Sequence, residues 1–201
     1  MELIYRRKEP NIIANNTVLN GRLRHIVFRC EEAVIEAEHE HNGTGKKNMK
    51  EIILMAHVFF GVACIMAAVW VFVDALNASE SNQKRISWIS RAAALFMWVS
   101  FVIGGYWYVV FYPADKAIIL KGPWPFAHEY FMETKEHLVI MLLLLASYLP
   151  IATSNNLAAN KDARRLVLWV AGLIPLLGLM IEGHGAIIAM GVKLALLAKQ
   201  V

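Results

Sequence analysis

Hydrophobic residues along the chain gather in four long blocks that are separated by polar segments. The blocks cover about residues 52–76, 86–112, 133–151 and 166–195. A helix needs about 20 mostly apolar residues to cross a bilayer, and each block reaches or nearly reaches that length. A soluble helix bundle would carry a polar stripe along each helix, and these blocks lack one. The pattern therefore predicts four transmembrane helices within residues 51–201.

The segments between the blocks predict how the helices follow one another. Residues 77–85 and 152–165 are short, polar and rich in turn-forming residues, and short links join neighbouring antiparallel helices. Residues 113–132 are amphipathic and aromatic, which is typical of a segment folded over one end of a bundle at the membrane surface. The predicted fold class is all-α, an integral membrane four-helix up-and-down bundle.

Residues 1–50 form a separate extramembrane segment in this interpretation. Apolar residues with helical spacing predict an amphipathic surface helix over about residues 21–40. The composition agrees with a membrane domain in the remainder, because the chain is 58% hydrophobic and 18% charged, against about 45–50% and 25% for soluble chains. Basic loops beside lipid head groups also explain the net charge of +4, so we expect a lipid bilayer and no nucleic acid as partner.

An even number of spans places both termini on one side of the membrane, which we call side A, the other being side B. Lys and Arg residues are spread over both sides, so the positive-inside rule gives no clear orientation. We expect a bacterial inner membrane with cytoplasmic termini, because a charged N-terminal tail without a secretion signal is difficult to export.

Ionisable groups inside a membrane are costly and mark functional sites. His57, His137 and His184 come from three different spans and lie at similar depth near side A, if each helix rises about 1.5 Å per residue. His128, in the link before the third span, belongs to the same side. A single interfacial histidine is readily explained by hydrogen bonds to carbonyls and head groups. For three at one depth, metal or cofactor ligation is the favoured interpretation.

Glycines accompany these histidines. Five of them lie beside a histidine or at side-A depth on the second helix: Gly61, Gly104, Gly105, Gly183 and Gly185. Glycine lets a flat group approach a helix axis, although small residues also serve helix packing alone. Neutral imidazoles facing each other across a bundle can supply both axial ligands of a haem. We therefore predict haem b, one copy, or two if His128 is a fourth ligand.

This pattern resembles the four-helix integral-membrane b-type cytochromes, in architecture across residues 52–195 rather than in a sequence motif. The resemblance implies bis-histidine haem ligation and electron transfer between quinone and a partner redox subunit. It also implies that the chain is a membrane subunit of an oxidoreductase complex. Covalent attachment of haem is excluded because no CxxCH motif is present.

Other functions remain open alternatives. The three histidines with Glu136 or Glu182 could bind non-haem iron, copper or zinc, although no span carries a His-x3-His or Glu-x2-His pair. Four residues are candidates for proton transfer or quinone binding: Glu133, Glu136, Glu182 and Tyr106. The chain could also be a non-catalytic accessory subunit of a membrane complex.

Overall fold

The computed structural model describes Gly45 and residues 48–199, and the chain divides into the units Met1–Met49 and Lys50–Val201. The amphipathic helix predicted over residues 21–40 lies outside the described residues. Within the described part every regular element is a helix. The predicted all-α class is therefore confirmed for this part of the chain.

Four helical segments dominate the second unit. The first helix is Asn48–Leu76, α2 is Gln83–Val110, and α5 is Lys161–Ala198. The remaining segment, Ala127–Ala152, begins with a π-helical turn, η1 (Ala127–Met132), and continues as α4 (Glu133–Ala152). All four are long and apolar enough to cross a membrane. They confirm the four apolar helices predicted from the sequence.

The observed helices extend beyond the hydrophobic blocks because polar and charged residues also form helical turns. The clearest case is α5, which begins five residues before Leu166. The side-chain oxygen of Asn160 accepts hydrogen bonds from the backbone N–H groups of Asp162 and Ala163, at 3.1 and 3.0 Å. These bonds satisfy donors that have no partner in the first helical turn. A hydropathy pattern does not detect such a start.

The links at the side-B end hold neighbouring helices together through polar contacts. Arg85 of α2 contacts both carboxylate oxygens of Asp74 on the first helix, each at 2.8 Å. Gln83 donates to the carbonyls of Thr153 and Asn155, at 2.9 Å each, in the link between α4 and α5. This half of the bundle is closely packed, since all four long helices contribute buried side chains to one core.

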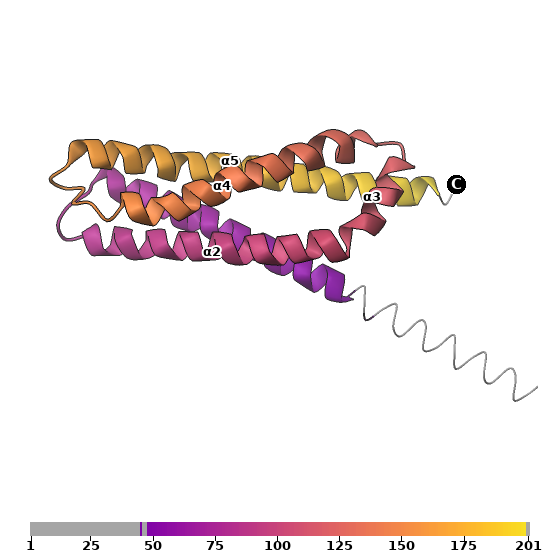
Figure 1. The fold of residues 1–201 in the computed structure, drawn as a ribbon, viewed down its shortest axis with the longest axis horizontal. Helices are drawn as coiled ribbons and strands as arrows, with labels where there is room; N and C mark the ends of the chain where they lie inside the picture. The colour runs from indigo at the N-terminus through magenta and orange to yellow at the C-terminus, as the bar shows by residue number, and fades with distance from the viewer. Residues whose placement is uncertain (1–44, 46–47, 200–201) are drawn as a thin grey trace, which may run out of the picture. The chain divides into compact units, whose positions relative to one another are not determined.

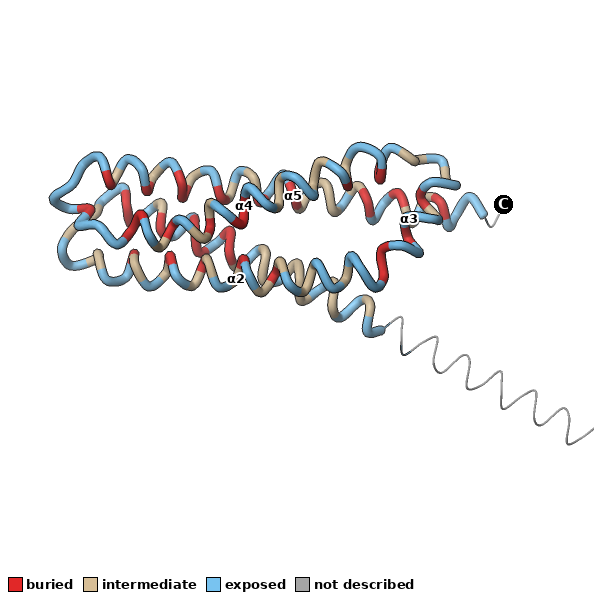
Figure 2. Tube along the Cα trace, viewed as in Figure 1, coloured by how far each residue is buried: buried red, intermediate tan, exposed pale blue. Residues whose placement is uncertain are grey.

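Burial separates an inner from an outer surface along the helices (Figure 2). The core side chains are mostly small or aliphatic, such as Ala68, Val71 and Ile174. Many of the largest apolar side chains face outward instead, and Trp169 and Val109 are 73% and 72% exposed. A water-soluble bundle rarely exposes so much apolar surface.

The side-A end has a different construction. The link after α2 forms the short helix α3 (Tyr112–Leu120), which leaves the end of α2 and reaches α5 (Figure 1). Together with η1 and the outer part of α5 it forms a second, smaller core around Tyr112, Ile119 and Ile188. The predicted surface segment of residues 113–132 is thus mostly helical, and it packs against α5.

Candidate functional site

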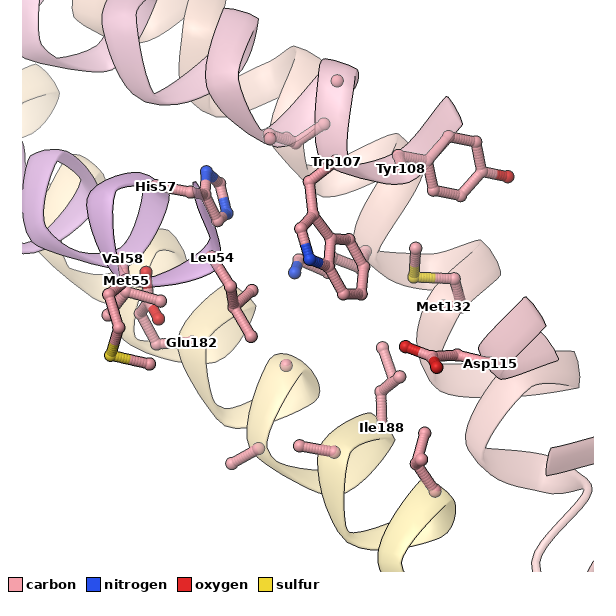
Figure 3. Close-up of a pocket in the computed structure, with 18 of the residues that line it drawn as sticks. Leu54, Met55, His57, Val58, Trp107, Tyr108, Asp115, Met132, Glu182 and Ile188 are labelled. Carbon is pink, nitrogen blue, oxygen red and sulfur yellow. The ribbon is translucent and has the colours of Figure 1, made fainter. Parts of the chain in front are cut away.

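A cavity of about 550 Å³ lies in the side-A half of the bundle. Its walls come from the first helix, α2, α3, η1, α4 and α5, and most of the lining is apolar. The volume falls within the range of about 300–1,000 Å³ that is common for small-molecule sites. Figure 3 shows Leu54 and His57 of the first helix and Trp107 of α2 at the lining of this space.

His57 is the predicted ligand that reaches the cavity. Its Nδ1 lies 2.9 Å from the carbonyl oxygen of Ser100 on α2, and the Ser100 hydroxyl donates to the His57 carbonyl at 2.9 Å. A carbonyl oxygen only accepts hydrogen bonds, so Nδ1 carries the hydrogen and Nε2 is the unprotonated nitrogen. A histidine that binds a metal is commonly held in this way, by a hydrogen bond from its other ring nitrogen to a carbonyl.

The imidazole of His57 fits against α2 because residue 104 is glycine. A Cβ atom at Gly104 would lie 2.6 Å from both Cε1 and Nδ1 of the ring. The flat group that approaches α2 at this glycine is therefore the histidine itself. A similar contact occurs at Gly61, where a Cβ atom would lie 2.9 Å from Oε1 of Glu182.

The other predicted glycines differ in their surroundings. Gly105 and Gly183 have open space where a Cβ atom would lie, with no atom within 4 Å. At Gly185 the nearest atom to that position is Nζ of Lys135, at 3.5 Å. Gly104, Gly105 and Gly185 line the cavity. At Gly105 and Gly185 the cavity lining therefore has room for a larger side chain, whereas at Gly104 the His57 ring occupies that space.

His137 and His184 do not line the cavity. His137 is exposed and its Nδ1 lies 2.8 Å from the Glu133 carbonyl, whereas the Nδ1 of His184 lies 2.6 Å from the Met180 carbonyl. Both therefore use Nδ1–H as a donor to a carbonyl of their own helix, and neither Nε2 has a hydrogen-bond partner among the described residues. His184 packs edge-on against the Phe131 ring, with 5.1 Å between ring centroids. The structure does not bring the three predicted ligands to one point.

His128 lies in η1 and is buried. Its Nδ1 is 2.8 Å from the hydroxyl of Tyr112, which is also buried. Burial raises the pKa of Tyr112, and the nearby groups Tyr108, Glu136 and Asp115 raise it further. The phenol therefore remains protonated and able to donate. This hydrogen bond joins α3 to η1 beside the cavity rather than in it.

The predicted acidic residues separate into two groups. Glu136 and Glu182 line the cavity, and Glu133 is exposed outside it. Tyr106 is also exposed, and its ring lies against Phe111. Among the described residues no three His, Cys, Asp or Glu side chains are grouped so that they could hold a metal ion.

Several lining residues lie outside the set of candidate site residues named from the sequence. Trp107 and Tyr108 both line the cavity. They follow Gly104 by three and four residues, so the helical period places them on its face, and this spacing was the available signal. Lys50 lies two turns before His57 on the same wall, where its Nζ is 2.6 Å from Asp115 of α3.

Comparison with known proteins assigns no family to the chain, since no family model matches it and neither does any curated protein or solved structure. Its function must therefore be argued from the cavity and the residues around it.

Proposed function

We propose that the chain is an integral membrane protein whose four long helices form an up-and-down bundle, and that it binds haem b and transfers electrons. The outward-facing apolar side chains support the membrane assignment, because lipid is the solvent that such a surface requires. The short links at the side-B end support the up-and-down order. We place the protein in a bacterial inner membrane with cytoplasmic termini.

The observation that carries the haem proposal is the arrangement of His57. Its Nδ1–H is held by the Ser100 carbonyl, and its unprotonated Nε2 has no hydrogen-bond partner among the described residues. The imidazole stands at the wall of a largely apolar cavity of ligand size. A bound haem would supply reversible one-electron chemistry at its iron. His57 would hold the haem iron, Ser100 would orient the imidazole, and the apolar walls would exclude water.

Three residues, His137, His184 and Met132, are candidates for a second ligand of the haem iron. His137 and His184 each use Nδ1 in a hydrogen bond within their own helix, which leaves Nε2 without a partner in the described residues, but neither lines the cavity. Met132 lines the cavity, and a methionine thioether is also an axial ligand of haem in some cytochromes. Haem is favoured over a directly bound metal ion, because a porphyrin supplies four of the ligands itself. One cavity of this size supports one haem rather than two.

The acidic lining residues support a coupled proton transfer. Glu182 and Glu136 reach the cavity from α5 and α4, together with Lys135. Groups of this kind can take up or release the protons that accompany quinone reduction. We propose quinone and a redox subunit of a larger oxidoreductase complex as the partners in electron transfer.

A reduced-minus-oxidised optical spectrum of the purified full-length protein tests the proposal. We expect the α-band of a b-type haem, and we expect His57→Ala to abolish it while the protein remains folded by circular dichroism. His137→Ala and His184→Ala are the matched variants, and loss of the band in one of them identifies the second ligand. Absence of any porphyrin from the wild-type protein, or full haem content in His57→Ala, would overturn the proposal.

A further inference from the structure

The cavity contains one buried hydrogen-bond donor that lacks an acceptor. Nε1 of Trp107 is the only buried side-chain nitrogen or oxygen without a partner in the described part of the chain. A buried tryptophan N–H usually has an acceptor, because an unmatched buried donor is costly. Figure 3 shows the indole of Trp107 within the cavity lining, beside His57.

Trp107 belongs to the outer, side-A part of the cavity. On the first helix, Lys50 lines this outer part of the cavity. It lies seven residues before His57, which is about 10 Å along the helix axis. Lys193 lines the same part on α5, where it lies eleven residues after Glu182, or about 16 Å along the axis. Nζ of Lys50 is 5.9 Å from the centroid of the Trp107 ring.

The carboxylate on the α3 wall of this end already has a partner. Asp115 is bound by Lys50, with 2.6 Å between Nζ and Oδ1. No salt bridge involves Lys193 within residues 48–199. Two donors of the outer end are therefore available to a ligand, the Trp107 N–H and the Lys193 ammonium.

We infer that the outer end of the cavity binds a carboxylate of a hydrophobic ligand, with Trp107 Nε1–H and Lys193 as its donors. A neutral carbonyl would satisfy Trp107 alone, whereas a carboxylate also uses the charge of Lys193 in a stronger, charge-assisted interaction. The inference rests on the proposed function for the identity of the ligand. It assigns the propionates of haem b to the outer end and the iron to the His57 end.

The same chemistry is available from a second source, the carboxylate of a free fatty acid from the membrane. A comparison of each ligand with a form that lacks the charge separates the two sources. Haem dimethyl ester retains the ring and iron of haem but has no free carboxylate. Oleyl alcohol has the chain of oleate without its charge.

The test is a titration of the porphyrin-free full-length protein in detergent with haem b and with haem dimethyl ester. We expect the wild type to bind haem at least about tenfold more tightly than the ester. Trp107→Phe retains an aromatic ring without the N–H, and Lys193→Gln removes the charge. Each should bring the ratio of the two affinities closer to one, whereas His57→Ala should weaken both porphyrins alike.

Matched controls come from residues away from the cavity. Trp98→Phe removes an indole N–H that donates to Ser147 at 3.1 Å, and Lys199→Gln removes an exposed lysine beyond α5. Both controls should keep the wild-type ratio of the two affinities.

Equal binding of haem and its ester by the wild type would overturn the carboxylate site but not the haem proposal. Binding of oleate over oleyl alcohol that depends on Trp107, without binding of either porphyrin, would keep the site and overturn the haem proposal. Binding of none of these ligands would overturn both.

Discussion

At the scale of single residues, His57 is positioned by two features of the neighbouring helix α2. The Ser100 carbonyl fixes which ring nitrogen carries the hydrogen, and Gly104 provides the space in which the ring lies. The first feature determines the chemistry available at Nε2, and the second determines where the ring can be. Neither depends on the identity of the bound ligand.

Replacing Gly104 with alanine tests this positioning. The added methyl group would lie 2.6 Å from two atoms of the imidazole, so the ring must move. We expect the unfolding free energy to fall by about 1–3 kcal/mol, as in other overpacked sites, and the haem content to fall several-fold. The control is Gly183→Ala, at a position that has no atom within 4 Å and does not line the cavity, and where helix propensity favours alanine by about 1 kcal/mol. Equal haem content in the two variants would contradict this account of His57.

The buried Tyr112–His128 hydrogen bond predicts a pH dependence of stability. A tyrosine in the unfolded chain ionises near pH 10, and burial raises the pKa of Tyr112 in the folded protein. The folded state thus holds this proton more tightly than the unfolded state. Its stabilising contribution is complete below about pH 10 and is lost as the pH rises towards the folded-state pKa.

Tyr112→Phe should therefore have two effects on unfolding curves measured between pH 8 and pH 11. At pH 8 it should lower the unfolding free energy by about 1–2 kcal/mol, because His128 loses a buried hydrogen-bond partner. Towards pH 11 the difference from the wild type should shrink, because phenylalanine cannot ionise. Tyr106→Phe, at an exposed position, serves as the control. A constant difference across this range would contradict the assignment.

At the scale of the helices, the two ends of the bundle serve different purposes. The side-B end is fastened by Arg85–Asp74 and by Gln83, and small side chains pack between the helices above it. The side-A end contains α3 and η1 in addition to the long helices (Figure 1). In a straight four-helix bundle the long helices would pack directly against one another there. The π-helical turn of η1 fits this view, since such turns are frequent at functional sites.

The start of α5 offers a prediction at this scale. Asn160→Ala removes the oxygen that accepts from the N–H groups of Asp162 and Ala163. We expect the unfolding free energy to fall by about 1 kcal/mol, measured by denaturation in mixed micelles. Asn160→Asp keeps an acceptor and should retain wild-type stability within about 0.5 kcal/mol. A loss of the same size in both variants would mean that the cap does not stabilise α5.

At the scale of the whole molecule, the proposed up-and-down bundle places the links between helices on alternating sides of the membrane. The links around Ser81 and Asn156 belong to one side, and Lys121 after α3 belongs to the other. All three residues are exposed. This arrangement follows from four crossings and does not depend on what the cavity binds.

Single cysteines at these three positions test the topology in a variant that lacks Cys30 and Cys64. With a membrane-impermeant maleimide on intact spheroplasts, we expect Ser81→Cys and Asn156→Cys to be labelled and Lys121→Cys to be labelled only after lysis. The reverse pattern would keep the four crossings and invert the orientation. Labelling of all three positions from one side would rule out the up-and-down arrangement.

The sequence alone was sufficient for the four long apolar helices, since hydrophobicity over about 20 residues is a local property of the chain. It also indicated that ionisable residues gather near side A, because helical rise converts residue number into depth. Which neighbouring helix a side chain faces is not a local property of the chain. It depends on how each helix packs against its neighbours, so only the tertiary structure decided this direction.

The three histidines selected from the sequence show this difference between depth along a helix and direction around it. Depth made them equivalent, but His57 packs directly against Ser100 and Gly104 of α2 at the cavity wall, while His137 and His184 bond to carbonyls of their own helices. The same packing turned Trp107 inward and left its N–H without an acceptor. The sequence thus determined the four long apolar helices and the order of the polar residues along them. Helix packing decided which of those residues share a cavity, because a rotation of about 100° between successive residues moves a side chain from one neighbour to another.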